Sequence, residues 1–135
     1  KSLLVMFEHH LCVTCVELHL DILKRPESRD LLKRFNIAVI DMWSEDKITT
    51  PDGSQQRIRD WSKKIDVKYA PSLVFFNAKG EEVFRSDAYL KAFHIQSVMD
   101  DVASGAYQEQ PNFQRLVDAR ADALRAQGIE VELMK

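Results

Sequence analysis

Short apolar runs recur along the chain and predict a sheet whose strands are separated by helices. The expected strands are residues 3–7, 37–42, 72–76 and 81–85. The first two runs are typical of strands covered on both faces. Residues 77–80 contain Asn77 and Gly80 and predict a tight turn, so the last two strands should form an antiparallel hairpin. This order indicates an α/β domain with a mixed central sheet and helices on both faces.

Apolar residues at helical spacing lie between these strands and after the last one. The stretches with this pattern are residues 13–25, 58–65 and 90–103. Pro26 is expected to end the first helix, and Gly105 follows the last one at the position that glycine favours. Residues 29–35 are expected to continue in a helical conformation. The polar residues 44–56 predict a surface loop or small hairpin.

The C-terminal residues 109–135 form an extension beyond this pattern. A helix is expected from Gln110-Pro111, with an apolar stripe, and should end at Gly128. The stripe consists of Phe113, Leu116, Val117 and Leu124. Ile129, Val131 and Leu133 alternate with glutamates and predict a strand. We expect a domain over residues 1–108 with the extension packed on its flank. Dimerisation or partner binding through the stripe stays open.

Composition narrows the class of protein. The chain has 135 residues, 45% apolar and 30% charged, which is ordinary for one globular domain. Its net charge of −2 offers no basic excess for binding nucleic acid. The longest apolar runs are about five residues, against the roughly 20 that a membrane helix needs, so no membrane insertion is expected. The chain begins at Lys1, directly before an apolar strand, so we expect an upstream signal peptide or further fold.

The strongest chemical signal is the pair Cys12-Val13-Thr14-Cys15, between the first strand and the first helix. Cys12 lies near the predicted N-cap, where unpaired N–H groups and the helix dipole favour a thiolate. We therefore expect Cys12 to have a lowered pKa and to act as the nucleophile. Cys15, one turn later on the apolar face, is expected to be the more buried, resolving thiol. This spacing also permits a disulfide.

Two other interpretations of the pair remain. The cysteines could be a buried apolar pair without redox chemistry. They could also bind zinc or copper together with His9 and His19. However, Cys12 and His19 are separated by about 10 Å along a helix, too far for one ion without unwinding. We therefore expect no metal site, and His19 is favoured as a histidine at the edge of the helix face rather than a ligand or base.

The chain resembles the thioredoxin superfamily over residues 1–105. The resemblance rests on the apolar strand Leu3-Leu4-Val5-Met6-Phe7, the Cys12–Cys15 pair, the segment Tyr69-Ala70-Pro71-Ser72-Leu73-Val74-Phe75-Phe76, and Gly80 with the strand after it. It implies a thioredoxin-like fold, a cis peptide bond before Pro71, and a backbone at Ala70 that pairs with an extended partner segment. Taken alone, Ala70-Pro71 would indicate a simple turn before a strand.

More narrowly, the chain is similar to the periplasmic SoxW-type thioredoxins of sulfur-oxidising bacteria. This likeness rests on Met6-Phe7-Glu8, the long loop containing Pro51-Asp52-Gly53, Tyr89-Leu90-Lys91-Ala92-Phe93-His94 and Val102-Ala103-Ser104-Gly105-Ala106-Tyr107. It implies an exported, periplasmic protein. A single cysteine pair is equally compatible with the cytosol.

Several positions depart from the ordinary thioredoxin pattern. Leu11 stands where a tryptophan precedes the first cysteine, and Val13-Thr14 replaces Gly-Pro. Together with Ala70 and Pro71, these three are the expected substrate-binding residues. Met6 aligns with the family's buried aspartate. Glu8 is then the nearby carboxylate that would shuttle the proton, unless it is only a solvated charge at the strand end.

The sequence therefore predicts a thiol–disulfide oxidoreductase that reduces a protein partner through a mixed disulfide and is recharged by an upstream donor. Its redox group is the Cys12/Cys15 pair itself, so no further cofactor is expected. The alternatives are a non-catalytic binding module and a metal-binding protein using Cys12, Cys15 and His9. A monomer is favoured. Trp43 either lines the surface near the cysteines or packs in the core.

Overall fold

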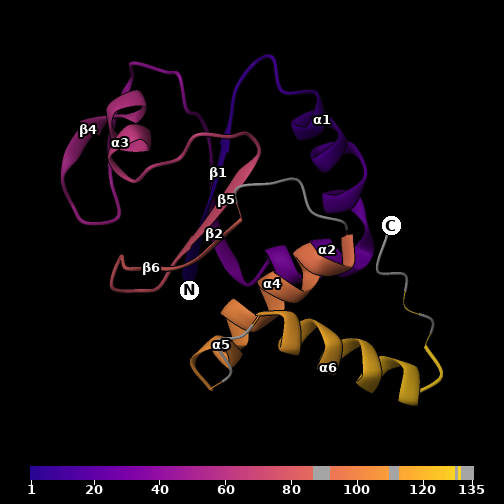
Figure 1. Cartoon of the computed structure of the whole chain (residues 1–135). Helices are drawn as coiled ribbons and strands as arrows, with labels where there is room; N and C mark the ends of the chain where they lie inside the picture. Colours follow the sequence, from indigo (N-terminus) through magenta and orange to yellow (C-terminus); the bar gives the residue numbers. More distant parts are fainter. Residues whose placement is uncertain (87–91, 110–112, 130, 132–135) are drawn as a thin grey trace.

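A four-stranded mixed sheet lies at the centre of the computed structural model, which describes residues 1–86, 92–109, 113–129 and 131 (Figure 1). Its strand order is β2–β1–β5–β6. The strands are β1 (Ser2–Glu8), β2 (Phe35–Asp41), β5 (Ser72–Phe76) and β6 (Glu82–Ser86). β1 is parallel to β2 and antiparallel to β5, and β5 and β6 form the hairpin. The predicted α/β class with a mixed sheet is confirmed.

Successive side chains of β1 point to opposite faces of the sheet, and each face packs against its own apolar core. Leu4 and Met6 belong to a core that also contains residues of the first helical segments and the long helix before the C-terminal extension. Val5 and Phe7 lie in a second core with Trp61. The helices of the first layer are α1 (Val13–Leu20), the 3₁₀ turn η1 (Ile22–Lys24), α2 (Pro26–Leu32) and α4 (Ala92–Ser104). Helix α3 (Ile58–Lys64) covers the other face, so helices lie on both sides of the sheet.

The first helix differs from its prediction. A single helix over residues 13–25 was expected, but α1 ends at Leu20 and the 3₁₀ turn η1 follows. Pro26 does not close a helix; it occupies the first turn of α2. Proline is tolerated there because the first-turn N–H groups have no partner within the helix. Leu18, Ile22 and Leu23 nevertheless reach the core as predicted.

The strand at residues 35–41 is not buried on both faces. β2 is an edge strand, and Ile37 and Val39 are exposed. Phe35 alone among its residues is buried, while Ala38 and Ile40 pack partly against the core of the α3 face. The prediction of a buried second strand was therefore wrong, because an apolar run does not reveal whether its strand lies at the edge of a sheet.

The polar segment after β2 forms a small antiparallel hairpin of β3 (Lys47–Thr49) and β4 (Gln55–Arg57), which leads directly into α3. The Asp52 carboxylate accepts hydrogen bonds from the Thr50 and Ser54 side chains and from the Ser54 N–H. These bonds lower the pKa of Asp52 to about 2. The hairpin also meets the β5–β6 turn, where Gly80 faces Pro51.

The C-terminal extension contains α6 (Phe113–Ala126), after the short α5 (Ala106–Glu109), and α6 lies beside α4 (Figure 1). Val117 and Ala121 are buried against Phe93 of α4. The Arg120 guanidinium lies 4.9 Å from the centre of the Phe93 ring and donates a hydrogen bond of 3.1 Å to the Ser97 hydroxyl. The extension therefore packs on α4.

Several residues named in the expectations for the C-terminal part lie outside the described residues. The side chains of Phe113 and Leu116 and the residues Gln110-Pro111 and Leu133 lie outside them. Ile129 and Val131 are described and are not in a strand. Tyr89, Leu90 and Lys91 also lie outside the described ranges. Within those ranges, no helix is long and apolar enough to cross a bilayer.

We predict that Gly80→Ala destabilises the protein more than Gly53→Ala. Both glycines have a positive φ, so each alanine costs about 1–2 kcal/mol of backbone strain. A Cβ on Gly80 would also overlap the backbone carbonyl of Pro51, whereas a Cβ on Gly53 meets open space. The free energy of unfolding from denaturant titration should fall by about 2 kcal/mol more for Gly80→Ala. Equal losses would show that the hairpin contact carries no stability.

Candidate active site

Cys12 caps the N-terminus of α1. Its backbone is extended, with φ −87° and ψ 98°, and its sulfur accepts a hydrogen bond of 3.0 Å from the Cys15 N–H. The Cys12 N–H itself donates to the His9 carbonyl, which closes the turn between β1 and the helix. The predicted N-cap position is therefore confirmed. An N–H group that a helix leaves unpaired is directed at the sulfur, as a developing thiolate requires.

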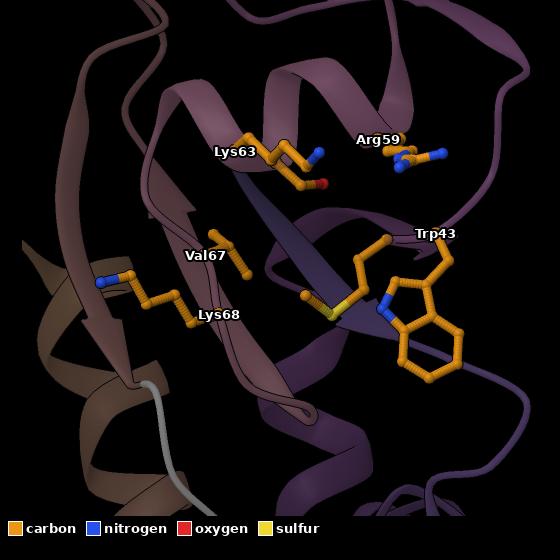
Figure 2. A pocket seen from close by; sticks show the side chains of 7 residues that line it. Trp43, Arg59, Lys63, Val67 and Lys68 are labelled. Atoms are coloured by element: carbon orange, nitrogen blue, oxygen red, sulfur yellow. The ribbon is translucent and has the colours of Figure 1, made fainter.

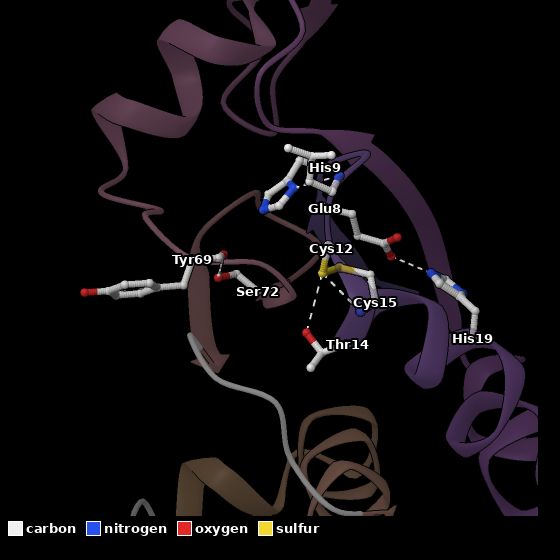
Figure 3. Close-up of a disulfide and its surroundings, with 9 residues drawn as sticks. Glu8, His9, Cys12, Thr14, Cys15, His19, Tyr69 and Ser72 are labelled. Carbon is white, nitrogen blue, oxygen red and sulfur yellow. Dashed lines mark hydrogen bonds and ion pairs between the residues drawn. A yellow bond between two sulfur atoms is a disulfide. The ribbon is translucent and has the colours of Figure 1, made fainter.

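The two cysteines form a disulfide with a Cα–Cα distance of 5.2 Å (Figure 3). Cys15 is 3% exposed and Cys12 is 8% exposed, so Cys15 is the more buried, by a small margin. Both line an open hollow of about 350 Å³. The Thr14 hydroxyl lies 3.5 Å from the Cys12 sulfur, within hydrogen-bond reach for a sulfur acceptor. The buried disulfide therefore borders a hollow that is open to the surface.

Pro71 lies at the same end of the sheet as Cys12. β5 begins at Ser72, which pairs with Phe7 near the end of β1, so the residues before Ser72 adjoin the β1–α1 turn. The Ala70–Pro71 peptide bond is cis, and Pro71 is buried. Figure 3 shows Tyr69 and Ser72 on the side of the disulfide away from His19.

Large apolar side chains surround the disulfide and face solvent. They are Leu11, Val13, Val16 and Tyr69, each more than half exposed. Val13, at 80% exposed, belongs to the dipeptide between the cysteines. An exposed group of this kind is typical of an interaction surface. Sequence reasoning named Leu11 and Val13 but not Val16 or Tyr69, although Tyr69 directly precedes Ala70-Pro71.

Glu8 does not stand alone at the strand end. Its carboxylate lies 2.5 Å from Nε2 of His19, and its side chain is 16% exposed. Alternation places Glu8 on the same face of β1 as Met6, toward α1, and His19 follows Cys15 by four residues on the same helix face. Both residues line the hollow that holds the disulfide. The His19 side chain is 37% exposed, which fits the expected position at the edge of the helix face, but its pairing with Glu8 was not predicted.

Trp43, which follows β2, is exposed rather than packed in the core, at 47%. The His9 ring stacks on its indole, with centroids 4.0 Å apart and planes within 4°. His10 meets the indole edge-on at 5.4 Å. Of the two expectations for Trp43, the surface position near the cysteines is therefore the one observed.

The histidines named as possible metal ligands are engaged with other groups in this arrangement. Among the described residues, no three histidine, cysteine, aspartate or glutamate side chains are placed to hold one ion. His9 stacks on Trp43 and accepts a hydrogen bond from the Leu11 N–H through Nδ1, while His19 pairs with Glu8.

A known protein family matches most of this chain. A family model described as a thioredoxin-like domain matches residues 1–103. The chain belongs to this thioredoxin-like family. No curated protein matches its sequence. With the Cys12–Cys15 disulfide, membership supports a role of the thiol–disulfide oxidoreductase type.

Solved structures agree on the fold. A thioredoxin-fold protein from Helicobacter pylori superposes with a TM-score of 0.77 at 15% identity, covering 91% of this chain and 86% of that one. A thioredoxin from Thermus thermophilus gives a TM-score of 0.58 at 22% identity, covering 76% and 73%. A DsbH oxidoreductase gives 0.55 at 18% identity, covering 76% and 72%. The fold is therefore thioredoxin-like.

We predict that Thr14→Val slows the reaction of reduced Cys12 with iodoacetamide near neutral pH. The hydroxyl donates to the thiolate, and valine keeps the shape without the donor. A hydrogen bond is worth about 0.5–1.5 kcal/mol, so the rate should fall about two- to tenfold. Thr49→Val, in β3, is the matched control and should react like the unmodified protein. A Thr14→Val rate equal to that of the control would show that the Thr14 hydroxyl does not stabilise the thiolate.

Proposed function

We propose that this thioredoxin-like protein reduces disulfides of a protein partner through the Cys12/Cys15 pair. One observation carries the proposal: the disulfide lines an open hollow, and the Cys12 sulfur accepts a hydrogen bond from the Cys15 N–H at the start of a helix. A purely structural disulfide needs neither the hollow nor the N–H group.

The reaction has two exchange steps. In the reduced protein, the Cys12 thiolate attacks one sulfur of the partner's disulfide and expels the other as a thiolate, which leaves a mixed disulfide. Cys15 then loses its proton and attacks the Cys12 sulfur. The bond to the partner breaks, the partner's second thiolate leaves, and Cys12–Cys15 is oxidised. A separate dithiol donor returns two electrons to it.

Partner docking is proposed on the surface around the disulfide. Leu11, Val13 and Tyr69 supply exposed apolar area, and Thr14 lies between the cysteines. The backbone of Ala70, before Pro71, would pair with an extended partner segment as an added strand does. Such pairing tolerates different side chains, so apolar contact and charge would select the partner.

Glu8 is proposed as the acceptor of the Cys15 proton. The family's buried aspartate aligns with Met6, which is 2% exposed and cannot take a proton. Glu8 lies two residues further on the same strand face and lines the hollow with Cys15. His19 holds the carboxylate in place from α1. The pair would thus supply the base for the resolving step.

The proposed setting is the periplasm or another exported compartment, on the strength of the SoxW-like segments around Glu8 and Pro51-Asp52-Gly53. Fractionation of the source cells, with antibody detection of the protein, tests this placement. Recovery only with cytosolic markers would contradict it.

Reduction of insulin disulfides in the presence of dithiothreitol tests the function. We predict that Cys12→Ser abolishes it, because the attacking sulfur is lost. Cys15→Ser should react once and remain as a mixed disulfide, visible as an added mass. Retention of insulin reduction by Cys12→Ser, or a Cys12–Cys15 bond that dithiothreitol leaves intact, would favour a binding module instead.

We predict that Glu8→Gln slows the resolving step by about tenfold or more, because general-base catalysis typically contributes at least that much. Stopped-flow measurement should show the mixed disulfide accumulating. Glu17→Gln, on the exposed side of α1, is the matched control. Decay of the Glu8→Gln mixed disulfide at the control rate would mean that solvent takes the proton directly.

A further inference from the structure

A second cavity, of about 500 Å³, adjoins Trp43 (Figure 2). It lies between the end of β2, helix α3 and the segment that follows α3. Its interior is formed by the buried residues Met42, Ser62 and Val67. Figure 2 shows the long side chains of Arg59 and Lys63 reaching it from α3. The volume lies within the range of pockets that bind small ligands or side chains.

The charged groups that line this cavity are all positive. They are Arg59, Lys63 and Lys68, and no carboxylate lines it among the described residues. Arg59 lies 3.6 Å from Glu45, and Lys68 lies 3.5 Å from Asp66, in exposed pairs that contribute little and exchange readily. Lys63 has no ion-pair partner within the described ranges. Because the whole chain carries a net charge of −2, this positive cavity is a local feature.

Trp43 connects the cavity to the disulfide. Trp43 forms part of the cavity lining, and the His9 ring stacks on its indole. His9 and His10 line the hollow that contains Cys12 and Cys15. The stacked rings of Trp43 and His9 therefore lie between the cavity and the hollow. A chain bound at Cys12 advances about 3.3 Å per residue when extended, so a few residues can pass these rings.

We propose that this cavity binds a carboxylate side chain of the redox partner, in an acidic segment a few residues from the partner's reactive cysteine. The proposal rests on the function proposed above. A guanidinium can hold a carboxylate through two parallel hydrogen bonds, and Lys63 adds a point charge. The apolar interior of Met42 and Val67 accommodates the methylene groups of a glutamate. The cavity thereby selects partners by charge, while the cysteines supply the chemistry.

Peptide binding tests this selection without any redox step. Seven-residue peptides with a central serine carry three glutamates before it, three after it, or glutamines in the same places. A change in tryptophan fluorescence reports binding, because Trp43 lines the cavity whereas Trp61 is buried elsewhere. At low salt, one of the acidic peptides should bind about tenfold more tightly than its neutral counterpart, and the preference should shrink as salt rises.

Charge reversal locates the binding site. Lys63→Glu lowers the charge of the cavity lining from +3 to +1 and should strongly reduce the preference for the acidic peptide. Lys79→Glu makes the same charge change in the β5–β6 turn, at the end of the sheet opposite Cys12, and should keep the preference. Equal binding of acidic and neutral peptides, or equal effects of the two variants, would overturn the proposal. Inorganic sulfate competing as well as the peptide at equal ionic strength would show a small-anion site only and also overturn it.

The same peptides with a central cysteine, blocked as a mixed disulfide with an aromatic thiol, separate this inference from the proposed function. The acidic peptide should be reduced about tenfold faster than the neutral one, and Lys63→Glu should lower that ratio. A ratio of one with both peptides reduced refutes the cavity's role alone. Failure to reduce even the neutral peptide refutes the proposed function, while the serine peptides still decide whether the cavity binds carboxylates.

Discussion

The hydrogen bond from the Cys15 N–H to the Cys12 sulfur, at the start of α1, is the interaction on which the rest of the site depends. It fixes the first sulfur where the helix leaves N–H groups without internal partners. Its position is set by the core, because β1 is buried between two apolar layers and Leu18 anchors α1 against one of them. The sulfur is therefore held by packing remote from it, and a negative charge developing there meets preorganised N–H groups.

Different groups flank the disulfide on its two sides. Glu8, at the end of β1, and His19, on α1, lie on the side of the buried Cys15, where the proposed resolving step releases a proton. The aromatic rings of His9 and Trp43 lie on the side of β2 and α3, where the basic cavity opens. In the proposed function, proton transfer and partner selection are thus assigned to separate groups of side chains. This arrangement also explains how a chain with Met6 at the usual acidic position can retain a carboxylate near its second cysteine.

Features set by local pattern were predictable, and features set by long-range packing were not. The strand Ser72–Phe76 and the N-cap role of Cys12 follow from residues close together in sequence. The Glu8–His19 pair required knowing how β1 and α1 face each other, across 11 positions. The exposure of Ile37 required knowing that β2 is an edge strand. Pro26 suits a helix end or a helix start equally well until the neighbouring segments are placed.

Titration of the reduced protein, followed by thiolate absorbance at ultraviolet wavelengths, tests the central claim most directly. Cys15→Ser isolates the signal of Cys12, and an unfolded sample supplies the reference. If the N–H group stabilises the thiolate, Cys12 ionises below the ordinary cysteine value of about 8.5 in the folded protein only. Ionisation of folded Cys12 at or above the unfolded value would contradict the account.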